Sequence, residues 1–128
     1  MILVIDDEPG ITELLSDILE SYGHPVLVAG DAEEALNILQ LQRPDVVLVD
    51  IMMPSVDGLS LALALRHHPV ARAVPLVAMS ASDSALALAD RTGDFNAHIS
   101  KPFENDELVD LIERVMQDAQ SARRRGVS

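Results

Sequence analysis

Short apolar runs that end in a reactive side chain recur along this chain of 128 residues. Four such pairs are residues 2–5 with Asp6 and Asp7, residues 46–49 with Asp50, residues 76–79 with Ser80, and residues 98–100 with Lys101. Apolar runs of this length between turn residues are typical of buried parallel strands. Because the carboxyl ends of parallel strands meet at one edge of an open α/β sheet, we expect these side chains to converge.

The converging groups would be three carboxylates, a hydroxyl and an ammonium group. Three carboxylates packed together need a divalent cation, and Mg²⁺ prefers oxygen ligands of this kind. A lysine beside the carboxylates needs an anion. The combination indicates a site for a magnesium ion and a phosphoryl group.

Strands alternate with helices five times along the sequence. The expected strands are residues 2–5, 25–29, 45–49, 75–79 and 97–100, and the expected helices are residues 9–22, 31–42, 59–67, 82–91 and a last one from 104. The expected capping residues are Asp7 or Glu8, Asp31, and Ser82 or Asp83, with Gly23 ending the first helix and Pro54 and Gly58 bracketing a loop. This alternation predicts a parallel sheet with helices on both faces.

The end of the chain differs from the rest in composition. From Ser121 onwards the sequence has no apolar periodicity and contains three successive arginines. We therefore expect one domain over residues 1–119 and a disordered tail or linker over residues 120–128.

Composition excludes several classes of function. A formal net charge of -12 argues against direct nucleic-acid binding by this domain. The sequence contains no cysteine, which excludes disulfides and thiolate metal sites and fits a reducing compartment. Its apolar stretches are far shorter than the about 18 residues of a membrane span, and Asp6 and Asp7 interrupt any secretory leader. We expect a cytoplasmic protein.

Four motifs in this order resemble the receiver domain of response regulators, the phosphoacceptor half of two-component signalling. The motifs are IDDEP at residues 5–9, VDIMMPSVDG at 49–58, MSA at 79–81 and SKPF at 100–103, and the resemblance covers residues 2–119. Each motif alone is weak, but the ordered set is specific. The resemblance implies a flavodoxin-like doubly wound (βα)5 fold with a five-stranded parallel sheet in the order 2-1-3-4-5.

The resemblance also implies a role for each acidic residue. Asp50 is expected to accept a phosphoryl group from a sensor histidine kinase or a phosphotransfer protein in a Mg²⁺-dependent reaction. Asp7 is expected to bind Mg²⁺ directly and Asp6 mainly through water. Asp50 and the backbone carbonyl of Met52 are expected to complete the protein ligands.

Two further residues are expected to contact the phosphoryl group. Lys101 would neutralise the oxygens that the metal cannot reach, and Ser80, in place of the commoner threonine, would donate a hydrogen bond. Placed positive charge is the main source of transition-state stabilisation in such transfers. Ala81 would keep the approach to Asp50 open, and Pro102 is expected to follow a cis peptide bond.

Two positions depart from the usual receiver pattern. His98 stands where many receivers carry an aromatic residue that turns inward on activation, so we expect a smaller rearrangement here. Residues 92–97 form an unusual connection after the fourth helix. Phosphorylation is expected to change a surface that binds a downstream output protein or domain, with a phosphorylation-dependent dimer as a further possibility.

The sequence argues against three alternatives to a signalling switch. A hydrolase of the aspartyl-phosphate kind carries a second acid two residues after its nucleophile, and Met52 at that position argues against turnover of external substrates. The complete set of site residues argues against a pseudo-receiver that acts without phosphate. The absence of a glycine-rich loop after the first strand argues against a nucleotide-binding flavodoxin-like protein.

Overall fold

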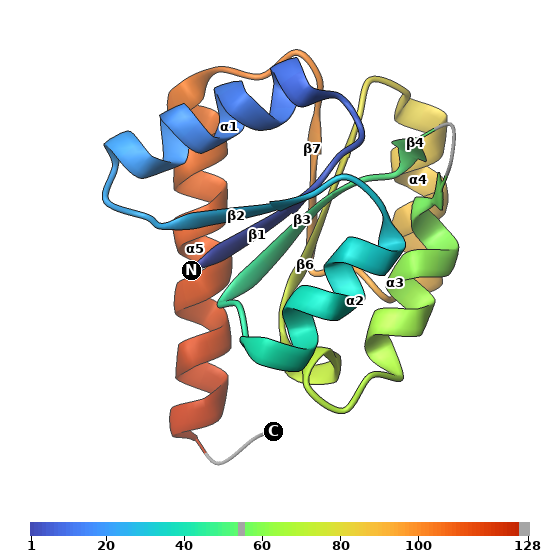
Figure 1. The fold of residues 1–128 in the computed structure, drawn as a ribbon, viewed down its shortest axis with the longest axis vertical. Coiled ribbons are helices and arrows are strands. Elements are labelled where there is room, and N and C mark those ends of the chain that lie inside the picture. Colours follow the sequence, from blue (N-terminus) through green and yellow to red (C-terminus); the bar gives the residue numbers. More distant parts are fainter. Residues whose placement is uncertain (54–55, 126–128) are drawn as a thin grey trace.

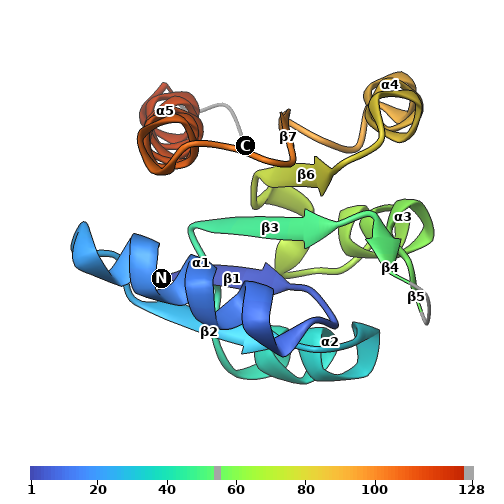
Figure 2. The same cartoon turned by 90° about the horizontal axis from the view of Figure 1, so that it is seen from above.

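A central parallel sheet lies between two layers of helices in the computed structural model, which describes residues 1–53 and 56–125 (Figures 1 and 2). The strands of this sheet are β1 (Ile2–Ile5), β2 (Val26–Ala29), β3 (Val46–Asp50), β6 (Leu76–Ser80) and β7 (Ala97–Ser100). Their spatial order is β2-β1-β3-β6-β7, and every neighbouring pair is parallel. Counted along these five strands, this is the expected order 2-1-3-4-5, so the flavodoxin-like fold is confirmed.

The helices divide between the two faces of the sheet. They are α1 (Pro9–Ser21), α2 (Ala32–Leu41), α3 (Gly58–Arg66), α4 (Asp83–Thr92) and α5 (Asn105–Arg124), with the short 3₁₀ helix η1 (Ala71–Ala73) before β6. One core contains buried residues of α1 and α5, and the other contains buried residues of α2, α3 and α4. Consecutive residues of β1 alternate between the two cores, which is the period of a pleated strand.

The central strands are buried on both faces. Every residue of β1, β3 and β6 is buried, which explains why these segments are continuously apolar rather than alternating. Strong burial of backbone and side chains makes this part of the sheet a rigid support. The residues at the carboxyl ends of these strands are therefore held in fixed positions.

Side-chain caps set several helix boundaries. Asp31 accepts a hydrogen bond from the Glu34 amide at 2.8 Å at the start of α2, and Ser82 accepts one from the Ala85 amide at 3.2 Å at the start of α4. Glu8 occupies the N-cap position of α1, but its side chain makes no capping hydrogen bond. The expected cap by Asp7 or Glu8 is therefore wrong. The Asp6 carboxylate instead accepts the Glu8 amide at 3.0 Å.

Two local expectations need correction. The predicted disordered tail is wrong for residues 120–124, because α5 continues to Arg124. Residues 126–128 lie outside the described part of the chain. The segment expected as a loop contains two short antiparallel strands, β4 (Met52–Met53) and β5 (Val56–Asp57), while Pro54 lies outside the described residues. Within the part that the structure describes, no helix combines the length and apolarity needed to cross a bilayer.

Candidate functional site

Acidic side chains from two neighbouring strands meet at the carboxyl edge of the sheet. Asp6 directly follows β1, and Asp50 is the last residue of β3. One carboxylate oxygen from each of Asp6, Asp7, Glu8 and Asp50 lies within 4.8 Å of the others. Asp6 and Asp50 are buried, with exposed fractions of 1% and 5%. The predicted convergence of Asp6, Asp7 and Asp50 is confirmed as geometry, whereas the proximity of Glu8 was not predicted.

Lys101 projects into this acidic cluster from the end of β7. Its Nζ lies 3.3 Å from Asp50 Oδ2 and 3.5 Å from Asp6 Oδ2. Its backbone amide donates to the Ser80 carbonyl at 2.9 Å, which ties the residue to the neighbouring strand β6. The expected cis peptide bond between Lys101 and Pro102 is present. One ammonium group thus serves two buried carboxylates.

The cluster carries more negative charge than Lys101 can offset. Burial raises the pKa of the Asp6 carboxyl above its usual value of 3.8, and the charge of Asp50 raises it further. The Glu8 amide and the Lys101 ammonium act in the opposite direction. Burial and the charge of Asp50 outweigh these two effects, so the net shift of the Asp6 pKa is upward. A divalent cation would relieve this repulsion.

The two oxygens of Asp50 have different environments. Oδ1 accepts the Met52 amide at 2.9 Å, and Oδ2 faces the Lys101 ammonium. These contacts fix the plane of the carboxylate at the mouth of the site. The Met52 side chain is exposed beside it. The assignment of the Met52 carbonyl as a metal ligand stays a prediction.

Ser80 lies at the end of β6, on the strand next to β3. It is buried, and its Oγ accepts the Ser82 amide at 3.0 Å. Ser82 is the capping residue of α4. The hydroxyl predicted to contact a phosphoryl group is thereby joined to the start of a helix.

Gly58 packs against the backbone that carries Asp50. A Cβ atom at this position would lie 2.4 Å from Ile51 Cα and 3.1 Å from the Asp50 carbonyl oxygen. The sequence indicated only loop punctuation here. The close approach explains why the first residue of α3 has no side chain, and it fixes the loop that follows β3.

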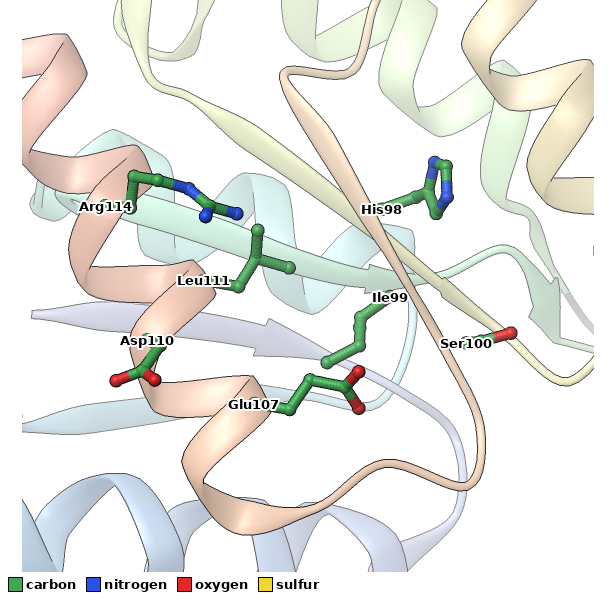
Figure 3. A pocket seen from close by; sticks show the side chains of 7 residues that line it. All are labelled: His98, Ile99, Ser100, Glu107, Asp110, Leu111 and Arg114. Carbon is green, nitrogen blue, oxygen red and sulfur yellow. The ribbon is translucent and has the colours of Figure 1, made fainter.

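His98 lies outside the acidic cluster. Its side chain is 44% exposed, and its Nδ1 lies 2.9 Å from Asp90 Oδ1 on α4. Figure 3 shows His98 and Ser100 on one side of β7 and Ile99 on the other, facing α5. The ring does not turn into the sheet in this structure.

An apolar groove of about 340 Å³ opens next to the cluster, between α1 and the segment after β7. Its lining includes Leu14, Ala81, Lys101 and Phe103. Leu14 lines this groove and is 53% exposed. Nothing in the sequence marks Leu14 as part of a surface groove, so this surface was not predicted.

Comparisons with known proteins agree on one family. The family model described as the response regulator receiver domain matches residues 2–113. An uncharacterized 14.6 kDa protein of Leptolyngbya boryana is 37% identical over 88% of this chain and 87% of its own length. The DNA-binding response regulator MtrA of Mycolicibacterium smegmatis is 36% identical over 84% of this chain and 46% of its own.

Solved structures give the same result. The receiver domain of a sensor histidine kinase from Pseudomonas aeruginosa, solved with a magnesium ion coordinated in its active-site cleft, has a TM-score of 0.81 at 28% identity. That alignment covers 91% of this chain and 96% of the other. The present chain spans about half the length of MtrA and of a probable transcriptional regulator, ycf27, of Porphyridium aerugineum that it also matches.

Proposed function

The chain belongs to the response regulator receiver domain family of two-component signalling, and we propose that Asp50 is its phosphoacceptor. The observation that carries the proposal is the setting of this carboxylate. Asp50 ends the central strand, one oxygen is held by the Met52 amide, and the other lies 3.3 Å from Lys101 Nζ. A carboxylate fixed in this way can attack phosphorus without a general base.

The acidic cluster fits a magnesium ion. Asp7 and Asp50 would bind it directly, Asp6 mainly through water, and the Met52 carbonyl would add a ligand. Support comes from the all-oxygen donor set and from the raised pKa of Asp6, which reflects burial of its carboxylate and, to a lesser extent, the charge of Asp50. When bound, the ion supplies positive charge to the transferring phosphoryl oxygens.

The remaining groups complete the transfer. An Asp50 oxygen forms a bond to phosphorus while the bond to the donor breaks, and the donor leaves with the electron pair. Lys101 offsets negative charge on the phosphoryl oxygens, and the Ser80 hydroxyl donates a hydrogen bond to one of them. Neither residue needs to gain or lose a proton.

We assign the donor to the class of phosphohistidine proteins, either a sensor histidine kinase or a phosphotransfer protein. The apolar groove beside Lys101 supports this, because an apolar face docked on Leu14 and Phe103 would bring a donor side chain close to Asp50. A cytoplasmic location belongs to the same proposal, since donors charged from ATP are formed there. We propose no turnover of external substrates, and the chain acts as a signalling domain.

The proposal also covers the output, which is the domain or protein that responds to phosphorylation of Asp50. Some relatives are transcriptional or DNA-binding regulators of about twice this length, so an output domain or a separate output protein would receive the signal. Dimerisation after phosphorylation is one form that the output could take. We propose that residues 1–119 carry the switch, while α5 itself continues to Arg124.

Intact-mass measurement with acetyl phosphate tests the phosphoacceptor. The wild-type chain should gain one phosphoryl mass with Mg²⁺ and much less with EDTA. Asp50→Asn should abolish the gain, while Asp17→Asn, which removes the same charge from an exposed position of α1, should leave it unchanged. Full labelling of Asp50→Asn would refute the assignment.

A further inference from the structure

Helix α4 is held to the sheet by little apolar surface. Its buried residues are Leu86 and Ala89, Ala85 packs partly buried against the same core, and the other seven residues of the helix are exposed. Elements with few buried apolar contacts move at low free-energy cost. Polar contacts therefore make a large relative contribution to the position of α4.

Two side chains of β7 contact acidic residues of α4. His98 Nδ1 lies 2.9 Å from Asp90 Oδ1, and the Ser100 hydroxyl donates to Asp83 Oδ1 at 3.3 Å. Asp83 is the first residue of α4 and Asp90 lies near its last turn. We call these two contacts the α4–β7 clamp, because they hold the helix near both of its ends.

The clamp meets the candidate site at the start of α4. Ser80 Oγ accepts the amide of Ser82, and Ser82 immediately precedes the clamp residue Asp83. A movement of the Ser80 hydroxyl toward a phosphoryl group on Asp50 would lengthen this bond. The start of α4 would then lose its hydrogen bond to Ser80, while the Ser100–Asp83 contact of the clamp would still hold it to β7.

Charged residues of α5 lie on the far side of β7 from the clamp. A cavity of about 450 Å³ between β7 and α5 is lined by Glu107, Asp110 and Arg114 of α5, and also by His98, Ile99 and Ser100 of β7. Figure 3 shows the α5 side chains across the strand from the His98 ring and the Ser100 hydroxyl. The partners of the clamp are thus the carboxylates of α4.

We propose that the α4–β7 clamp stabilises the resting position of α4 and so opposes phosphorylation of Asp50. The proposal rests on the proposed function of Asp50. A phosphoryl group shifts a conformational equilibrium only by its differential contacts with the two states, and a contact made in the resting state alone subtracts from that shift. For solvent-exposed pairs such as these, the effect should be about two- to fivefold per contact.

Affinity for beryllofluoride, a phosphoryl mimic, tests the clamp at saturating Mg²⁺. Asp90→Ala and Ser100→Ala should each tighten the dissociation constant by about two- to fivefold relative to wild type. Asp90→Asn keeps an acceptor oxygen for His98, so its affinity should lie closer to wild type. Equal or weaker binding in both alanine variants would overturn the proposal.

A matched control comes from the other exposed histidine pair. His24 Nε2 lies 2.9 Å from Glu113 Oε2 on α5, away from α4. Glu113→Ala breaks a contact of the same kind, removes the same charge as Asp90→Ala and should leave beryllofluoride affinity unchanged. The same gain in Glu113→Ala would show a general effect of surface charge and would also overturn the clamp.

Amide hydrogen exchange gives an independent measurement. In the absence of beryllofluoride, amides of α4 should exchange faster in Asp90→Ala than in wild type, and those of α2 should not change. Unchanged exchange in α4 would contradict the clamp. The outcomes for the two proposals remain distinct, because failure of wild-type protein to bind beryllofluoride would contradict the role of Asp50 itself.

Discussion

Lys101 Nζ lies 3.3 Å from Asp50 Oδ2, although the two residues are 51 positions apart in the chain. The contact puts the ammonium group where a transferred phosphoryl group would need positive charge, and also where a metal ion would be repelled. Lys101→Met should therefore slow phosphorylation by acetyl phosphate strongly and at the same time tighten Mg²⁺ binding. Calorimetric titration with Mg²⁺ checks the second effect, and weaker Mg²⁺ binding in this variant would contradict it.

The raised pKa of Asp6 predicts that this carboxyl group lowers the folding stability of the metal-free protein in a pH-dependent way. Its folded-state pKa lies above the unfolded value near 3.8, so the folded state binds the proton more tightly. Below 3.8 both states are protonated and the penalty is absent; it grows as the pH rises through the folded-state pKa. Asp6→Asn should then raise the melting temperature by a few degrees at pH 7 in EDTA, with the gain disappearing toward acid pH.

Urea unfolding of wild type and Asp6→Asn at several pH values measures the difference in their stability, because the other titrating groups cancel between the two proteins.

Mg²⁺ should stabilise the wild-type chain through binding to the folded state. The stabilisation should disappear in an Asp6→Ala, Asp7→Ala double variant. An undiminished gain there would place the metal elsewhere.

Gly58→Ala should disturb the site from outside it. The added Cβ would overlap Ile51 Cα, so the loop after β3 must shift at a cost of about 1–3 kcal/mol in stability. Because Asp50 and Met52 flank Ile51, Mg²⁺ affinity should fall as well. Gly10→Ala is the control, since a Cβ there meets nothing within 4 Å. Comparable losses in both variants would argue against a specific contact.

Arg66 should matter for stability rather than for chemistry. Its guanidinium donates to the backbone carbonyls of Asp94 and Val74 at 2.8 Å each and to Asn96 Oδ1 at 2.6 Å. Arg66→Ala would remove this donor from the two carbonyls, while Asn96 Oδ1 would keep the Leu76 amide, at a cost of about 1–3 kcal/mol measured by denaturant unfolding. Arg43→Ala, at an exposed position, should change stability by at most about 0.5 kcal/mol.

The sheet and the acidic cluster were predictable because local sequence encodes them directly. Strands buried on both faces read as continuous apolar runs, and parallel pairing brings their ends to one edge. Asp6, Asp50 and Lys101 were therefore placed correctly. The convergence needed no knowledge of side-chain contacts.

Features that depend on contacts between distant elements were missed. Nothing in the sequence near Arg66 indicates that its side chain donates hydrogen bonds to the segment after α4. Nothing near His98 indicates its pairing with Asp90. The end of α5 was misjudged for a different reason. Its half-buried residues beyond Val115 include Ala119 and Ala122, whose small side chains give a weak apolar period.

The position of the acyl phosphate tests the central claim most directly. After reaction with acetyl phosphate and Mg²⁺, reduction with borohydride converts a phosphorylated aspartate to homoserine, which peptide mass spectrometry can locate. Homoserine should appear at residue 50 and not at Asp6, Asp7 or Asp57. Homoserine at another aspartate, with residue 50 unmodified, would contradict the assignment of Asp50 as the phosphoacceptor.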